Sequence, residues 1–300
     1  MQIHTVEHIC QKLRNRDFDV MQFERYCFDI LAKKDGDVLL IKVLMNIDSF
    51  SSLQAEDLKK MASVLVASPV LCGFHGRNFN MLPDSVYERF GIPAVNPDTF
   101  LSSLDLVMPY ILSKKGKNTV SIDNILLKDM RDESGMSFRK MANVLGLSKK
   151  TVYLAEKTGK TSLDVASVIE SFFSRDIRLP VDIFSFDISF KVHKKTEFEE
   201  SVTKLTSRIG YSDLVFHTAP ASIIFKDDDA FLMCDIGGSS VNARKVENLK
   251  NLGDFCEVPR FVIVNRSNVL NVGGVAVVKI EEIKKTGSKD EFMELICDRE

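Results

Sequence analysis

One short stretch of this 300-residue chain constrains its fold more than any other, and it runs from Met136 to Lys160. It reads MSFRKMANVLGLSKKTVYLAEKTGK, with apolar residues at helical spacing on both sides of a central Gly-Leu-Ser. Because this spacing gives each segment one apolar face, we expect two helices packed across a tight turn. Ser137 and Ser148 precede the two segments, where a hydroxyl can cap the first free amide groups of a helix.

The positions at the crossing and the turn of this helix pair carry residues with little steric demand. Ala142 leaves room where the helices cross, and Gly146, four residues later, permits the positive φ that a short turn requires. The positions expected to face inward are all apolar or small: Met141, Ala142, Leu145, Leu147, Val152 and Ala155. This is the pattern of a helix-turn-helix, whose second helix enters the major groove of DNA.

Local charge separates this interpretation from the plainer one, an ordinary helical hairpin with a solvated basic face. From Ser137 to Lys160 there are six basic residues and one acid, Glu156, although the whole chain has a formal net charge of −2. Contact with DNA phosphates requires such a local concentration of positive charge. We therefore predict a DNA-binding surface with these residues: Arg139, Lys140, Ser148, Lys149, Lys150, Thr151, Tyr153, Lys157 and Lys160.

Two roles are predicted within this surface. The early turns of a recognition helix enter the groove, so base edges are expected to be read from there by Lys149, Lys150, Tyr153 and Lys157. Arg139, Lys140 and Lys160 are expected to contact phosphates, which fix position without reading sequence.

The longer run from Leu127 to Phe173, which contains this stretch, resembles the lambda-repressor/Cro-type helix-turn-helix domain. In that family a leading helix ends near a glycine, the hairpin follows, and a further segment closes the bundle. Here LAEKTGK and SLDVASVIESFF stand in those closing places. The flanking segments CFDILAKKDGDVLLIKVLMNID and GIPAVNPDTF are similar to those of one archaeal group of transcriptional regulators. The resemblance implies a transcriptional regulator that binds double-stranded DNA as a homodimer, and it is silent on the target sequence.

The rest of the composition predicts a cytoplasmic protein. Its six cysteines are scattered without a C-x-x-C pair, which favours reduced thiols over a disulfide framework or a zinc site. No apolar run approaches the ~20 residues that a membrane span needs, and the first residues lack the apolar region of a signal peptide. We expect no metal, no cofactor and no membrane contact.

The residues before the hairpin alternate between helical and strand patterns. Helices are expected at Thr5–Arg16 and Leu53–Leu65, a connecting segment at Phe100–Tyr110, and strands at Phe18–Met21, Cys27–Ala32, Val38–Met45, Val70–Gly73 and Gly91–Val95. This order is that of the core of PD-(D/E)xK nucleases and Holliday-junction resolvases. Such enzymes hold a metal between an aspartate and an acid-x-Lys motif.

The chemistry of this region argues against catalysis. Asp29 and Lys42 are suitably placed, but Leu40 stands where the motif needs an acid, so a divalent ion would have too few oxygen ligands. We expect a structural ion pair or a decayed site, with no catalytic residue.

Beyond Pro180 the sequence repeats its beginning. Phe198–Leu205 matches Val6–Leu13, and Asp227–Asp235 matches Asp35–Val43, both at an offset of 192 residues. In this alignment Leu232 and Cys234 replace Leu40 and Lys42, which removes the motif from the second copy. Weaker matches link the following helices (offset 191), Phe261–Val264 with Val70–Gly73, and Gly274–Val278 with Gly91–Val95.

The predicted fold is therefore α/β: two α+β flanking domains with endonuclease-like mixed sheets, related by duplication, around a central all-α helix-turn-helix bundle. The predicted domains are residues 1–110, 111–178, which include a hairpin before the bundle, and 179–300. The hairpin tip at Lys114–Asn118 is either a phosphate contact or a solvated loop. Gly237–Ser240 either receives a phosphate or simply caps a helix at Ser240, and Asp227–Asp229 is expected to be a solvated turn.

The function that this sequence favours is sequence-specific DNA binding by a transcriptional regulator, with a recognition helix at about residues 148–157. Two alternatives remain open. One is a metal-dependent nuclease or resolvase that the helix-turn-helix directs to its target. The other is a ligand-sensing scaffold in which the flanking domains bind a small-molecule effector.

Overall fold

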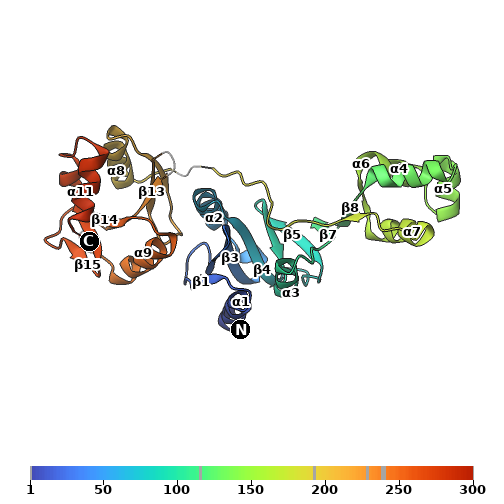
Figure 1. Cartoon of the computed structure of the whole chain (residues 1–300), viewed down its shortest axis with the longest axis horizontal. Helices are drawn as coiled ribbons and strands as arrows, with labels where there is room; N and C mark the ends of the chain where they lie inside the picture. Colours follow the sequence, from blue (N-terminus) through green and yellow to red (C-terminus); the bar gives the residue numbers. More distant parts are fainter. Residues whose placement is uncertain (1, 115–116, 192–193, 228–229, 238–240, 300) are drawn as a thin grey trace. The chain divides into compact units, whose positions relative to one another are not determined.

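The computed structural model describes residues 2–114, 117–191, 194–227, 230–237 and 241–299 (Figure 1). Across these residues the chain forms eleven α-helices and two mixed sheets, which confirms the predicted α/β class. Its contacts divide it into two compact units, unit 1 (residues 1–18, 41–50 and 68–188) and unit 2 (residues 19–40, 51–67 and 189–300). Within the described ranges, no helix has the length and apolar character needed to span a bilayer.

Unit 1 contains six of these helices and most of the larger sheet. The helices are α1 (Gln2–Arg14), α3 (Pro97–Leu104), α4 (Asn124–Glu133), α5 (Phe138–Leu145), α6 (Lys149–Thr158) and α7 (Leu163–Phe173). The strands are β4 (Ser68–His75), β5 (Ser85–Arg89), β6 (Ile92–Val95), β7 (Ile111–Lys114), β8 (Lys117–Ile122), β9 (Lys160–Ser162) and β10 (Arg178–Leu179), and β3 (Asp37–Asn46) has residues in both units.

Unit 2 contains the smaller sheet, five helices, and the first two strands of the larger sheet. The helices are α2 (Ser52–Leu65), α8 (Glu197–Arg208), α9 (Ala243–Cys256), α10 (Ile280–Ile283) and α11 (Lys289–Cys297). The strands are β1 (Asp19–Gln22), β2 (Ile30–Lys34), β11 (Ser212–Val215), β12 (Ile223–Asp227), β13 (Ala230–Gly237), β14 (Arg260–Val264), β15 (Asn271–Val272) and β16 (Val275–Lys279).

Two elements of the amino-terminal region were not foreseen. Helix α3 lies where a connecting segment was expected, and β5 forms a hairpin with β6 through the register Arg89↔Ile92. The α3 signal was present in the sequence, because Asn96 accepts a hydrogen bond from the Thr99 amide (2.7 Å) and Pro97 follows it at the first helical position. The prediction of a connecting segment at Phe100–Tyr110 was therefore wrong in its first half.

Helices α4–α7 lie together in one part of the chain, next to β8 (Figure 1). They pack around one apolar core that also includes residues of β8. Of the residues expected to face inward, Leu147 is partly buried against this core, and the others are buried in it: Met141, Ala142, Leu145, Val152 and Ala155. Ser137 and Ser148 cap α5 and α6, as predicted. Gly146 ends α5 at φ +66°, the left-handed conformation that only glycine adopts without strain, so the predicted turn is confirmed.

The strand order supports the predicted repeat. The larger sheet has the order β1-β2-β3-β4-β6-β5-β7-β8-β10, with β9 beside β8, and the smaller sheet has the order β11-β12-β13-β14-β16-β15. The first six strands of the larger sheet thus follow the same order as the whole of the smaller sheet. The sense of the pairs also agrees, because β1·β2 and β11·β12 are antiparallel whereas β4·β6 and β14·β16 are parallel.

The strand registers correct the offset between the copies. Asp19 pairs with Lys33 in the first copy and Ser212 with Lys226 in the second, so equivalent residues differ by 193 positions. The offset of 192 that the sequence suggested for the first helix and hairpin is therefore wrong by one. An error of one position matters because it exchanges the two faces of a strand. At the corrected offset Lys42 is equivalent to Asp235, and Leu40 to Met233.

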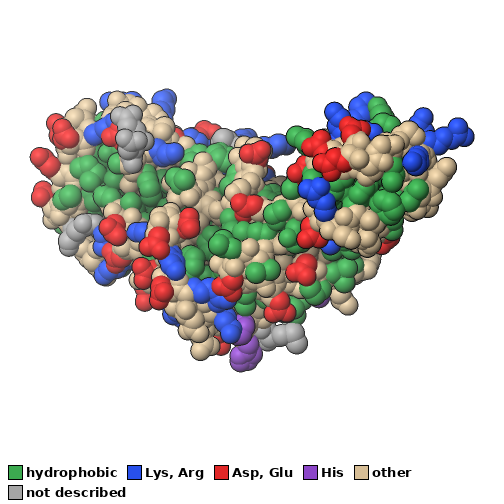
Figure 2. Space-filling model, turned by 45° about the vertical axis from the view of Figure 1, so that its right-hand side comes forward, with side chains coloured by type: hydrophobic (Ala, Val, Ile, Leu, Met, Phe, Trp, Pro, Cys, Tyr) green, Lys and Arg blue, Asp and Glu red, His purple; other side chains and the backbone are tan. Residues whose placement is uncertain are grey.

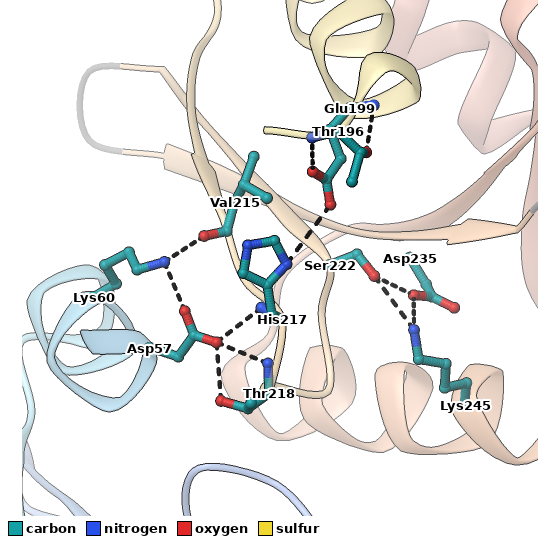
Figure 3. A network of polar contacts seen from close by, with 10 residues as sticks. All are labelled: Asp57, Lys60, Thr196, Glu199, Val215, His217, Thr218, Ser222, Asp235 and Lys245. Carbon is teal, nitrogen blue, oxygen red and sulfur yellow. Dashed lines mark hydrogen bonds and ion pairs between the residues drawn. The ribbon is translucent and has the colours of Figure 1, made fainter. Parts of the chain in front are cut away.

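Unit 2 is held together by a buried ion pair and its hydrogen bonds (Figure 3). The Asp57 and Lys60 side chains of α2 are 0% and 1% exposed and lie 2.6 Å apart. The second carboxylate oxygen of Asp57 accepts hydrogen bonds from the amides of His217 (2.8 Å) and Thr218 (2.7 Å) and from the Thr218 hydroxyl (2.9 Å). The Lys60 ammonium donates to the carbonyl oxygen of Val215. Each charge is thus paired and hydrogen-bonded, as burial requires.

Candidate nucleic-acid interface

Helix α6 separates its residues into a buried and an exposed face. Val152 and Ala155 are buried, whereas Lys149, Lys150 and Lys157 are exposed. The periodicity of the sequence produces this separation, because residues three apart lie on one side of a helix. In the space-filling view Lys and Arg side chains project from the part formed by α4–α7, at the right of the picture (Figure 2).

The single acid of the basic stretch is neutralised inside the bundle. Arg131 of α4 donates two hydrogen bonds to Glu156 of α6, at 2.8 Å from Nε and 2.9 Å from Nη2. The hydrogen bond to Glu156 raises the pKa of Arg131 above its ordinary value, against an opposing effect of burial. The Arg131 guanidinium also lies 4.5 Å from the centre of the Phe138 ring. Glu156 therefore contributes no free negative charge beside the exposed lysines.

Tyr153 is fixed in position by its neighbours. Its ring meets that of Phe138 edge to face, with centroids 5.6 Å apart, and the Lys157 ammonium lies 5.5 Å from its centre. The ring is still 42% exposed. Such a side chain can contact a base without a large loss of conformational freedom, because its orientation is already set.

Two residues of the predicted surface have a local role. Ser148 accepts a hydrogen bond from the Thr151 amide (3.0 Å), and the two hydroxyls lie 2.8 Å apart. Both side chains therefore help to begin α6. Their predicted contact with DNA stays a prediction.

The other predicted phosphate contacts lie at the ends of the helix pair. Arg139 and Lys140 are exposed in the first turn of α5, and Lys160 lies on β9, where it pairs with Ser121 of β8. The hairpin β7–β8 was predicted correctly, but its residues 115–116 lie outside the described ranges, as do Asp228–Asp229 and Gly238–Ser240. The cap of α9 is Asn242, which accepts from the Arg244 and Lys245 amides, so the suggested cap at Ser240 is wrong.

One cation of this surface was missed by the sequence analysis. Lys128 of α4 is exposed and lines a hollow of about 150 Å³ beside Tyr153 and Lys157. It precedes the basic stretch in the sequence, and only the packing of α4 against α6 brings it to the same surface. No local pattern could have indicated this neighbour.

In the first copy, the positions that would form the metal site of a nuclease hold too few carboxylates. Asp29 and Lys42 are buried, and so is Leu40, where the motif needs an acid. Across the described residues, no group of three or more His, Cys, Asp or Glu side chains is arranged to hold a metal.

The equivalent place in the second copy holds an aspartate, which the corrected offset reveals. Asp235, at the position of Lys42, is 3% exposed. It accepts hydrogen bonds from Ser222 and from Lys245 of α9, the latter at 2.8 Å (Figure 3). The assignment of Leu232 and Cys234 to the motif positions was therefore wrong. A single carboxylate that is already bonded to a lysine supplies too few oxygen ligands to hold a divalent ion.

Comparison with known proteins gives two kinds of match. Residues 2–109 match the family model described as "PD-(D/E)XK superfamily domain". Over 285 residues the chain is 33% identical to a protein of Pyrococcus furiosus, which covers 92% of this chain and 90% of the relative. Over 305 residues it is 30% identical to a protein of Methanothermobacter thermautotrophicus, which covers 99% and 96%. Both relatives carry the provisional name "HTH-type transcriptional regulatory protein".

Proposed function

This chain belongs to the archaeal family whose members are provisionally named HTH-type transcriptional regulatory proteins, and from that premise we propose that it is a sequence-specific DNA-binding regulator. The observation that carries the proposal is the exposed face of α6. It presents three lysines and a positioned tyrosine, while the neighbouring acid is paired inside the bundle. A helix with these properties, reached through a turn at a left-handed glycine, fits the major groove as the second helix of a Cro-type helix-turn-helix.

We expect base-reading and phosphate-binding residues to respond differently to substitution. Lys149→Ala should weaken binding to a selected target sequence by about 1–3 kcal/mol, and Tyr153→Ala likewise, with non-specific affinity nearly unchanged. Lys140→Ala should weaken binding to all DNA alike and lower the slope of log affinity against log salt by about one unit. Fluorescence anisotropy titrations with the selected duplex and with a scrambled duplex, repeated at several salt concentrations, measure the two affinities and the salt slope.

The controls for this experiment are Tyr153→Phe and Lys204→Ala. The first keeps the ring contact with Phe138 and removes only the hydroxyl, and the second removes an exposed lysine of unit 2. Lys204→Ala should leave both duplexes bound as before. Equal losses on both duplexes for Lys149→Ala would show that α6 does not read bases.

As part of the same proposal, the protein acts as a homodimer on two half-sites and is not an enzyme. The dimer follows from the Cro-type resemblance, and exposed apolar side chains on the bundle, Val144, Val168 and Phe172, give a second copy a surface to cover.

The second candidate function is a metal-dependent nuclease, which the PD-(D/E)XK match favours. Leu40 removes the acid from the motif of the first copy, and in the described part of the second copy Asp235 belongs to no group of three or more metal ligands, so we expect no cleavage. A plasmid-nicking assay with Mg²⁺ or Mn²⁺ measures this. Cleavage that disappears in Asp235→Asn or Asp29→Asn would overturn the expectation and identify the copy that acts.

A further inference from the structure

Unit 2 contains a cavity of about 430 Å³ that neither the DNA surface nor the nuclease comparison uses. Two similar sets of segments form its walls: strand ends and the adjoining helix end from each copy of the repeat. The lining residues are Leu31, Lys33, Val38, Ser63, Val64, Leu65, Val66, Lys226, Ala230, Phe231, Phe255 and Cys256. All of them belong to unit 2.

The lining consists largely of equivalent positions from the two copies. Lys33 and Lys226 are equivalent at the offset of 193 that the strand registers give. Val38 and Phe231 are related by the same offset, and Leu65 and Cys256 are the last residues of α2 and α9. Both helices also end in the same unusual way, with a non-glycine cap in the left-handed conformation at φ +49° and +57°. The cavity is thus a product of the repeat, in which each copy contributes one lysine.

The described lining residues carry charge of one sign. Among the described residues that line the cavity, two side chains are cationic and none is acidic. Within the described residues Lys226 forms no ion pair, and Lys33 has only Glu257 at 3.5 Å, on a solvent-exposed contact. Such an exposed ion pair contributes little free energy, so another anion can replace Glu257 beside Lys33.

Apart from Ser63, the remaining side chains of the described wall are apolar or a thiol. Leu31 and Val64 are buried, and the side chains of Val38, Phe231 and Phe255 are half-buried. Burial raises the pKa of the Cys256 thiol to about 11, although the positive charge of Lys33 acts to lower it. Lys33 thus lies close enough to the partly buried Cys256 for its charge to act on the thiol, while the Lys33 side chain itself stays 44% exposed.

We propose that this cavity is a binding site for a small amphipathic anion, a carboxylate with an apolar chain. The carboxylate pairs with Lys33 and Lys226, and the chain lies against the aliphatic and aromatic wall. An apolar chain alone would leave the two ammonium groups in water and gain nothing from them. An anion without a chain would gain nothing from the apolar wall.

Isothermal titration calorimetry of the full-length protein with decanoate and decan-1-ol tests this site, because the two probes share a chain and differ in charge. We expect saturable binding of one decanoate per chain, at least about tenfold tighter than decan-1-ol, since a charge-assisted contact contributes this much. In the double variant Lys33→Ala/Lys226→Ala the preference for decanoate should disappear. Lys204→Ala, an exposed lysine away from the cavity, is the matched control and should keep the preference.

A second pair of variants tests the location by filling the cavity. Ser63 is exposed on α2 and lines the cavity, whereas Ser52 is exposed on the same helix and does not. Ser63→Trp should abolish decanoate binding, and Ser52→Trp should not. Circular dichroism confirms that both variants are folded. Equal affinity for the two probes, or decanoate binding that survives Ser63→Trp, would overturn the proposal.

Discussion

Asp57→Ala is expected to lower the stability of unit 2 by about 3–5 kcal/mol, the usual effect of removing one partner from a buried ion pair. The Lys60 ammonium would stay 1% exposed without its carboxylate, 2.6 Å away in the native protein. The amides of His217 and Thr218 would lose their acceptor at the same time. The effect is large because the loss leaves an unpaired charge and unpaired donors, not because the pair itself is strong.

Two measurements check this result. Urea unfolding followed by circular dichroism gives the stability, since the chain has no tryptophan to report fluorescence. Hydrogen exchange at the amides of His217 and Thr218 reports the loss locally. The double variant Asp57→Ala/Lys60→Met removes both charges and should recover much of the lost stability. If it is as unstable as Asp57→Ala, the buried charge of Lys60 is not the cause.

Arg131→Met should destabilise the α4–α7 bundle by about 2–4 kcal/mol. The Arg131 and Glu156 side chains are 12% and 10% exposed, so removing the guanidinium leaves a shielded carboxylate without its two hydrogen bonds. It also frees a negative charge beside the lysines of α6. We therefore expect DNA affinity to fall further than the loss of stability alone would cause.

The matched control is Arg175→Met. Arg175 pairs with Glu133 at 3.8 Å, but both side chains are more than half exposed, so this contact is expected to contribute little. Thermal unfolding and anisotropy titrations of both variants at a temperature where each is folded separate stability from affinity. Equal effects of the two substitutions would show that the buried position of the Arg131 pair is unimportant.

Much of the α4–α7 region could be predicted because its signals are local. A cap joins Ser137 to the amide three residues later, and the turn depends on one residue, Gly146, and its φ. The inward face of each helix follows from the spacing of its apolar residues. The repeat was also visible, but its offset was wrong by one, because neighbouring apolar residues in a buried strand fit either register until the pairing partner is known.

The sequence by itself determined the helices that carry the candidate DNA surface, the turn between them, and the main helices and buried strands that the two halves share. Only the tertiary structure decided which distant residues complete these parts. Arg131 meets Glu156 across 25 positions, Asp57 meets Thr218 across 161, and the cavity joins equivalent lysines of the two copies. Capping and periodicity act within one or two turns of chain, so they leave a local pattern. Pairing of buried charges depends on how elements pack, and packing leaves no pattern at a fixed spacing.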